Sequence, residues 1–335
     1  MAGIERYGSY VPYFRLTRAA LGGGRGERAI ASFDEDAVSM GVEAAREALR
    51  GAPLRSVDTL LYATTTPAYA EKLDASILHA ACDLPEDVHA LDLGGTTRAG
   101  VSALLTACDL AAAGRQVLVV ASDMTIGAPE SGREREGGDA AAAFLVGSGA
   151  DPALRLVGRA SRSDEILDVW RTPELRFPRQ WEERFGAQVL APRLVEVATE
   201  ALSRADLQPA DLTTVILDST NARAIKELPR TLGLKPEQIA DPLADSVGRA
   251  GSAHALLLLA RALDTASPGD RIALVTAIDG ADALIFEVGE SIGGARPLHS
   301  VDRWIAARRN DVTHHTYLKW RGILPFEPPR RPDPE

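Results

Sequence analysis

Apolar residues recur along the chain in two patterns, one typical of amphipathic helices and one typical of buried strands. Helical spacing of Val, Leu and Ala predicts helices over 36–50 and 193–204. Short runs with few polar positions predict strands covered on both faces, at 59–63, 116–122, 141–146, 213–217, 270–277 and 283–288. The alternation of these elements predicts an α/β protein.

The same series of elements occurs twice. Residues 94–101 (GGTTRAGV) lead into one long Ala/Leu helix, and residues 247–252 (VGRAGS) lead into another. Each Arg-Ala-Gly is followed by a helix, a turn, a strand, a Gly-Asp or Gly-Ala-Asp step, and a last strand. Small residues permit a sharp turn, and the helix directs its unpaired N–H groups back at that turn. A duplication of this kind predicts two related halves whose helix starts meet near the centre.

Composition restricts the class of protein. The 335 residues are 45% apolar, which is ample for a large core, and the net charge of −10 argues against nucleic acid or an anionic membrane as the main partner. Neither a signal-like segment nor a long apolar run is present, so we expect a cytoplasmic protein without membrane partners. Cys82 and Cys108 stand in apolar helical surroundings, so we expect structural thiols and no metal site.

Two segments have no counterpart in the duplication. Residues 163–190 carry four aromatic side chains among charges, and they either close over the edge of the core or form a substrate tunnel or partner surface. Residues 291–335 form an extension whose tail, from Tyr317 to Pro332, is either a packed terminus or a contact with another molecule. The two halves then occupy 1–162 and 191–290.

The duplicated βαβαβαββ order, the Gly-rich junctions and the segment 269–287 resemble the thiolase superfamily. Segments 3–12, 34–49 and 269–287 are similar to its 3-hydroxy-3-methylglutaryl-CoA synthase branch, of bacterial and archaeal type. The resemblance implies a thiolase fold, a five-layered α-β-α-β-α sandwich in which two five-stranded sheets enclose the helices after the Arg-Ala-Gly motifs. We expect a homodimer through the edge strand after the first of these helices.

The tail resembles the linker that leads, in many relatives, into an OB-fold and zinc-ribbon domain that binds acyl-CoA. That domain is absent from this chain, so a separate OB-fold and zinc-ribbon protein is a candidate partner of the tail.

The resemblance also implies acyl-CoA chemistry, with a coenzyme A thioester as substrate, no cofactor, and transfer of the acyl group to a cysteine. Matched by position, the residue before the first Arg-Ala-Gly is Thr97, and the family's glutamate falls at 64–66, which is all threonine. The family's histidine and asparagine fall at Asp218 and Asn221, and Arg249 stands near another family asparagine. A threonine hydroxyl needs an adjacent base to act as a nucleophile, so the family's Claisen mechanism is not expected.

Two hypotheses remain open. In the first, which we favour, an enzyme of lipid or polyketide metabolism acts on acyl-CoA or acyl-carrier thioesters and forms or cleaves a carbon–carbon bond in an aldol or retro-aldol step. Asp218 or a nearby tyrosine would move the proton, and the helix ends at Thr97 and Arg249 would hold the oxyanion. In the second, a catalytically inactive subunit keeps the acyl-CoA groove and scaffolds an OB-fold partner or an active homologue.

Further residues are candidates for contact with the substrate. They are Thr65, Thr66, Arg98, Gly251 and His254. For Arg98 and Arg249 the alternative is pairing with carboxylates, and for His254 it is a buried, hydrogen-bonded position.

Overall fold

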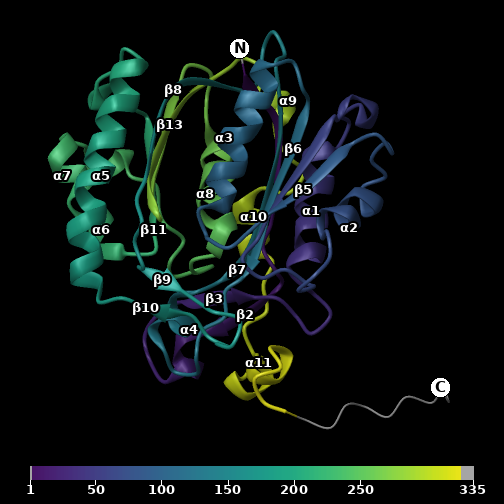
Figure 1. The fold of residues 1–335 in the computed structure, drawn as a ribbon, viewed down its shortest axis with the longest axis vertical. Coiled ribbons are helices and arrows are strands. Elements are labelled where there is room, and N and C mark those ends of the chain that lie inside the picture. The colour runs from purple at the N-terminus through teal and green to yellow at the C-terminus, as the bar shows by residue number, and fades with distance from the viewer. Residues whose placement is uncertain (1, 326–335) are drawn as a thin grey trace.

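The computed structural model describes residues 2–325, and its helices and strands form a five-layered α-β-α-β-α sandwich (Figure 1). The principal strands are β1 (Gly3–Tyr10), β4 (Thr59–Ala63), β5 (His89–Leu93), β6 (Val117–Met124), β7 (Asp139–Gly147), β8 (Leu154–Ser163), β11 (Thr214–Ser219), β12 (Arg271–Ala277) and β13 (Gly280–Val288). They are hydrogen-bonded in the order β11-β12-β13-β8-β1-β7-β6-β4-β5. The expected thiolase-type layering is confirmed.

The duplication is visible in the strand pairing. β1 runs antiparallel to β7, and β8 runs antiparallel to β13 along most of its length. β8 therefore occupies in the second half the position that β1 occupies in the first. The halves meet where β1 and β8 pair only at Gly3 with Arg155 and Ile4 with Leu154. Within the described residues the first half has five strands and the second has four, so the expectation of two five-stranded sheets is wrong for the second.

The two helices after the Arg-Ala-Gly motifs form the central layer. They are α3 (Ala99–Ala112) and α8 (His254–Thr265), and their apolar side chains share one buried cluster with the inner faces of the strands on both sides (Figure 1). A Cβ atom on Gly100 would lie 2.0 Å from the carbonyl oxygen of Ser252, which is backbone and cannot move aside cheaply. The glycine of the first motif is therefore required by the close approach of the two helix starts.

Helices also cover the outer faces. α1 (Ala37–Leu49) and α2 (Ala75–Ala81) pack on the first half, and α5 (Glu183–Arg204) packs on the second. α5 begins ten residues before the predicted helix and continues through Pro192, a residue that usually interrupts a helix. No helix in the described part of the chain combines the length and the apolar character needed to cross a membrane.

The strand that follows α3 is not at an edge. It is β6, which pairs with β7 on one side and β4 on the other, whereas the series ends at β5 and β11. The expectation that this strand forms a dimer edge is therefore wrong, and a homodimer stays a prediction.

Shorter elements complete the chain. The hairpins are β2 (Phe14–Thr17) with β3 (Glu27–Ile30) and β9 (Val169–Trp170) with β10 (Arg179–Gln180), and the remaining helices are α4 (Gly132–Glu136), α6 (Ala222–Lys226), α7 (Leu228–Leu232), α9 (Ile292–Ala295), α10 (Val301–Ala306) and α11 (His314–Trp320). Tyr317 on α11 is fully buried against Leu16, Leu21 and Ile30, so the extension packs on the first half. Residues 326–332 of the predicted tail contact lie outside the described residues.

Candidate functional site

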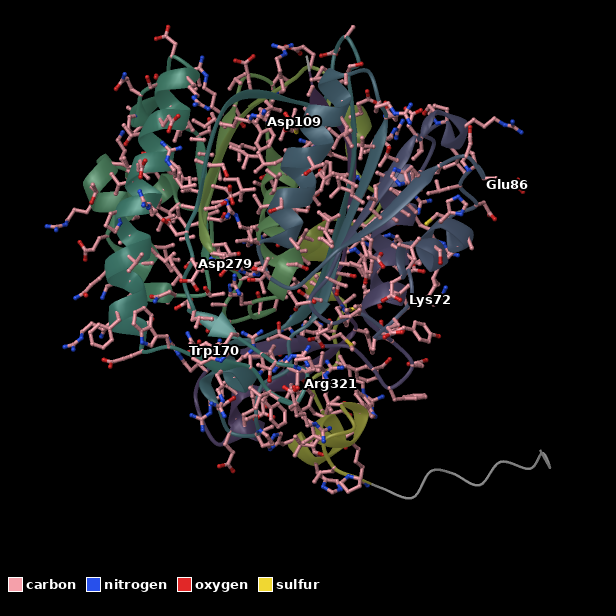
Figure 2. The ribbon with its side chains drawn as sticks, in the orientation of Figure 1. Lys72, Glu86, Asp109, Trp170, Asp279 and Arg321 are labelled. Carbon is pink, nitrogen blue, oxygen red and sulfur yellow. The ribbon has the colours of Figure 1, made fainter. Side chains whose placement is uncertain are left out.

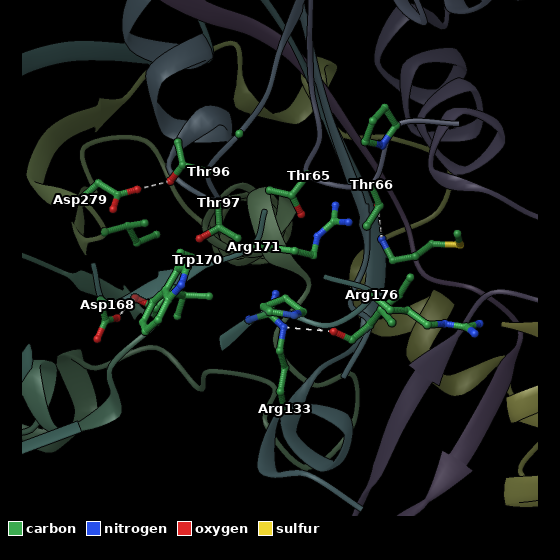
Figure 3. A pocket seen from close by; sticks show the side chains of 18 of the residues that line it. Thr65, Thr66, Thr96, Thr97, Arg133, Asp168, Trp170, Arg171, Arg176 and Asp279 are labelled. Atoms are coloured by element: carbon green, nitrogen blue, oxygen red, sulfur yellow. Dashed lines mark hydrogen bonds between the residues drawn. The ribbon is translucent and has the colours of Figure 1, made fainter. Parts of the chain in front are cut away.

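A cavity of about 510 Å³ lies where α3 begins. Its walls come from the loop after β4, the turn before α3, the end of β6 with α4, the insertion over 163–190, and the turn between β12 and β13. Trp170 and Asp279, two of the lining residues, lie near the lower ends of the central helices (Figure 2). The ionisable side chains that line the cavity are Arg133, Asp168, Arg171, Arg176 and Asp279 (Figure 3).

Thr97 lines this cavity directly before α3. The residue is 8% exposed, and its Oγ1 atom has no hydrogen-bond partner among the described residues. Its neighbour Thr96 is held in place, because the Thr96 hydroxyl donates to Asp279 and accepts from the Arg98 backbone N–H at 3.2 Å. The cavity wall therefore contains a buried hydroxyl whose hydrogen-bonding capacity is not used within the described part of the chain.

Asp123, at the end of β6, organises the wall beside Thr97. Its Oδ1 atom accepts from the Thr65 hydroxyl at 3.0 Å and the Thr66 hydroxyl at 2.9 Å, and its Oδ2 atom accepts from the Ser252 N–H at 2.6 Å. Thr65 and Thr66 line the cavity as expected, but their hydroxyl hydrogens are already donated. Gly251 has a φ of +50°, and a Cβ there would lie 2.2 Å from Asp123 Oδ2, so this glycine serves the wall and is not among the lining residues.

Asp218 and Arg249 form an ion pair outside the cavity lining. Asp218 Oδ1 accepts from Arg249 Nε at 2.8 Å, and Oδ2 accepts from Nη2 at 3.2 Å, while Asp218 is only 3% exposed. The backbone of Arg249 is fixed as well, since its N–H donates to Glu136 at 2.8 Å and its carbonyl accepts from Gly138 at 3.0 Å. Asp218 was predicted to move a proton and Arg249 to stabilise an oxyanion, but in the structure the two side chains pair with each other.

His254 is buried near this ion pair. It is 4% exposed, its Nδ1 atom has no hydrogen-bond partner within the described residues, and burial lowers its pKa to about 4. The imidazole is therefore neutral at pH 7. His254 does not line the cavity. Of the two alternatives, the buried position is therefore observed, but Nδ1 lacks the hydrogen bond that was expected with it.

Asn221 has a local structural role. Its Oδ1 atom accepts from the Ala224 N–H at 3.2 Å at the start of α6, and its Nδ2 atom donates to the carbonyl of Glu183 at 2.9 Å. The side chain joins α6 to α5 and has no part in the cavity lining.

The guanidinium of Arg98 forms several hydrogen bonds beside the end of β8 and the start of β13. Its guanidinium donates to both carboxylate oxygens of Asp282 at 2.8 and 2.9 Å, and to the carbonyls of Asp279 and Arg162 at 2.8 Å. A bidentate pair of this kind fixes the start of α3 against the second half. Pairing with a carboxylate, the alternative for Arg98 and Arg249, is therefore observed for both.

Neither cysteine of the chain lines the cavity. Cys82 and Cys108 are buried in helical surroundings, and burial raises the pKa of Cys82 to about 11 and of Cys108 to about 12. Both thiols are protonated at neutral pH, as expected for structural cysteines.

Several lining residues were missed by sequence reasoning. One of them is Trp170, which the insertion contributes to the cavity wall, whereas Trp181 and Phe185 of the same segment remain exposed. Arg133 was not singled out in the sequence, and the structure places it on α4 at the cavity wall. The available signal for Asp279, and for Asp123 behind the cavity wall, was their place at or just beyond the end of a buried strand, where polar side chains gather at one edge of a sheet.

Solved structures define the class of fold. A crystal structure of 3-oxoacyl-(acyl-carrier-protein) synthase III from Aquifex aeolicus VF5 matches with a TM-score of 0.76 and 22% identity, over 86% of this chain and 100% of that chain. A structure of MvaS in complex with 3-hydroxy-3-methylglutaryl coenzyme A matches with a TM-score of 0.80 and 20% identity, over 99% of this chain and 94% of that chain. The chain therefore has the thiolase fold.

Sequence comparison adds particular relatives. The hydroxymethylglutaryl-CoA synthase of Methanopyrus kandleri is 29% identical over 97% of this chain and 98% of that protein, and that of Pyrococcus furiosus is 27% identical over 95% of each. Residues 202–283 match the family described as 3-oxoacyl-(acyl-carrier-protein) synthase III C terminal. The resemblance to hydroxymethylglutaryl-CoA synthases is confirmed along nearly the whole chain, while the replacement of the family's catalytic residues stays a prediction.

Proposed function

We propose that this chain binds an acyl thioester of coenzyme A or of an acyl carrier protein in the cavity before α3. The observation that carries the proposal is Thr97, which lines the cavity (Figure 3) and whose buried hydroxyl has no hydrogen-bond partner among the described residues. A thioester carbonyl oxygen is a hydrogen-bond acceptor, and negative charge that develops on it is favoured near the positive end of a helix. The names of the relatives, hydroxymethylglutaryl-CoA synthases, support the same ligand class.

The chemistry we propose is formation or cleavage of a carbon–carbon bond, in an aldol or retro-aldol step without a covalent acyl intermediate. Such a step needs a group that takes a proton from a hydroxyl while the thioester oxygen becomes negative. Asp218 was expected in that role, but its carboxylate is bound by Arg249. Asp279 replaces it in our proposal, because it lines the cavity beside Thr97 and accepts a hydrogen bond from Thr96.

A second function, thioester binding without catalysis, is favoured by a different observation. Asp218, Arg249 and His254 lie outside the cavity lining, and the cavity is lined by no histidine or cysteine in the described part of the chain. In that case the chain presents the thioester to an OB-fold partner or to an active homologue.

Titration calorimetry with acetyl-CoA tests the binding. Thr97→Val keeps the shape of the side chain and removes the hydroxyl, so we expect acetyl-CoA to bind about tenfold more weakly. Thr106→Val is the matched control, since Thr106 is exposed on α3, the helix that follows Thr97, and lies outside the cavity. The proposal fails if the unmodified chain does not bind acetyl-CoA, or if both variants bind as it does.

Turnover separates the two functions. We expect release of acetyl-CoA from 3-hydroxy-3-methylglutaryl-CoA, followed by mass spectrometry, and loss of that release in Asp279→Asn with binding retained. Binding without turnover in the unmodified chain would favour the non-catalytic subunit.

A further inference from the structure

Arg133 is a cation with unused hydrogen-bond donors at the wall of the cavity. It comes from α4, and its Nε atom donates to the carbonyl of Ile126 at 3.1 Å. Among the described residues, neither Nη atom has a hydrogen-bond partner and no carboxylate lies within ion-pair distance of the guanidinium. A partly buried guanidinium without an anion is unusual, because removing its charge from water is costly unless a partner compensates.

The charges around Arg133 are mostly of its own sign. Arg249, Arg28 and Arg171 act on it as like charges, and the carboxylate of Asp123 opposes them. The carboxylate of Asp123 is already occupied by threonine hydroxyls and by the Ser252 N–H. Burial, followed by these like charges, lowers the pKa of Arg133 to about 10, so the group is still positive at pH 7. This wall of the cavity therefore carries a surplus positive charge.

The backbone that carries Arg133 is firmly held. The next residue, Glu134, is fully buried, and its carboxylate accepts from His314 at 3.0 Å and from the Glu130 N–H at 2.6 Å. Its carbonyl oxygen accepts at 2.5 Å from Arg28, which is fully buried. The guanidinium is thus preorganised, and a ligand that meets it loses little free energy in ordering it.

The other two cavity arginines differ in their surroundings. Arg171 and Arg176 are exposed residues of the insertion, and Arg176 also donates to the carbonyl of Gly322. Exposed arginines of this kind suit the solvated phosphates of a coenzyme A or carrier-protein thioester. Arg133 is less exposed and lies at the wall with Thr97, where the acyl group would be expected (Figure 3).

We propose that Arg133 binds a carboxylate on the acyl group, so that the preferred ligands are thioesters of dicarboxylic acids. The planar guanidinium matches a carboxylate with two parallel N–H···O bonds, and both of its Nη atoms are available for them. This inference rests on the proposed function, because it requires the thioester to lie in the cavity with its carbonyl near Thr97.

The test compares thioesters that differ only at the end of the acyl group. Calorimetry with succinyl-, glutaryl- and adipoyl-CoA is set against butyryl-, pentanoyl- and hexanoyl-CoA. We expect at least one carboxylate-bearing thioester to bind tenfold to a hundredfold more tightly than its matched uncharged partner, the range that a charge-assisted hydrogen bond provides. In Arg133→Gln that preference should disappear, while binding of the uncharged thioesters stays within a few fold.

Arg135→Gln is the matched control, because Arg135 is an exposed arginine of the same short helix and lies outside the cavity lining. It should keep the preference. Arg133→Lys keeps the positive charge and should keep part of the preference for carboxylate-bearing thioesters. This variant covers the case in which Arg133→Gln misfolds. Melting temperatures of all variants check the fold.

Two outcomes would overturn the inference and leave the proposed function intact. One is equal affinity of the unmodified chain for each matched pair. The other is an Arg133→Gln variant that loses affinity equally for all thioesters and for free coenzyme A, which would assign Arg133 to the phosphates. If no thioester and no free coenzyme A binds at all, the proposed function fails together with this inference.

Discussion

Arg321 and Asp139 form an ion pair in the interior of the protein, although 182 residues separate them along the chain. Their side chains are 2% and 0% exposed. The ring of Tyr317 lies close to both Arg321 and Arg28, whose guanidinium carbons are 5.3 and 5.2 Å from its centre. Arg321 comes from the C-terminal extension (Figure 2), so the extension supplies a charge that the first half needs at the start of β7.

Removal of that charge should destabilise the whole fold. In Arg321→Ala we expect the free energy of unfolding to fall by about 3 kcal/mol, because Asp139 stays buried with one fewer cation beside it. The decrease should stay near the lower end of the usual range, since Arg28 still lies 3.5 Å from Asp139. Unfolding in urea, followed by circular dichroism, measures the change.

Arg309→Ala is the control for this prediction. Arg309 pairs through its side chain with Asp311, and both side chains are more than half exposed, so its loss should change stability by less than about 1 kcal/mol. Equal effects of the two substitutions would mean that the buried pair does not hold the extension in place.

The parts of the fold that depend on local pattern were predictable, and the parts that depend on tertiary approach were not. The starts of the two central helices follow from small residues next to a run of Ala and Leu. This pattern is local, so a short stretch of sequence is enough to recognise it. The cavity is lined by Arg133, Trp170 and Asp279, which come from segments far apart in the chain. Their spacing in the sequence does not predict that they lie close together. The ion pair of Asp218 with Arg249 was missed for the same reason. Each residue was assigned a separate role from the sequence, which does not show that the two side chains meet in the fold.

Gly251 should tolerate substitution poorly. Its φ of +50° is strained for any residue with a side chain, and a Cβ would lie 2.2 Å from Asp123 Oδ2. We expect Gly251→Ala to lower the free energy of unfolding by several kcal/mol and to weaken acetyl-CoA binding, because Asp123 must move away from Thr65 and Thr66. Urea unfolding and calorimetry on the same variant measure both effects.

Gly269→Ala separates backbone strain from steric conflict. Gly269 has a φ of +85° but no atom within 4 Å of the added Cβ, so only the strain should remain, about 1 kcal/mol. A loss at Gly251 no larger than at Gly269 would show that the wall beside Asp123 yields easily.

The ion pair of Asp218 and Arg249 should contribute to stability more than to ligand binding. A double-mutant cycle with Asp218→Asn and Arg249→Gln should give a coupling of about 1 to 3 kcal/mol in the free energy of unfolding, since one partner is 3% exposed. Affinity for acetyl-CoA should stay within a few fold in both single variants. A complete loss of turnover with unchanged stability would instead return Asp218 to the proton-transfer role first predicted from the sequence.

Asp264 should make the protein less stable as the pH rises from about 4 to about 6. Burial raises the pKa of this carboxyl from 3.8 to about 6, and the group is held by the Tyr7 hydroxyl at 3.0 Å and the Val301 N–H at 2.8 Å. Between these two values the folded state binds more protons than the unfolded state, so the free energy of unfolding falls as the pH increases. The contribution is about 1 to 3 kcal/mol, present in full below pH 4 and lost above pH 6.

Asp264→Asn removes this titration while keeping the shape of the protonated side chain. Its amide oxygen can accept from Val301, and its NH₂ group can donate to the Tyr7 oxygen, so the variant should match the unmodified chain near pH 4 and exceed it at pH 7. Asp206→Asn, at an exposed position, serves as the control and should follow the unmodified profile. Urea unfolding at half-unit steps from pH 4 to 7 gives the three curves. Parallel curves for Asp264→Asn and the unmodified chain would mean that water reaches Asp264 in the folded state and keeps its carboxyl ionised.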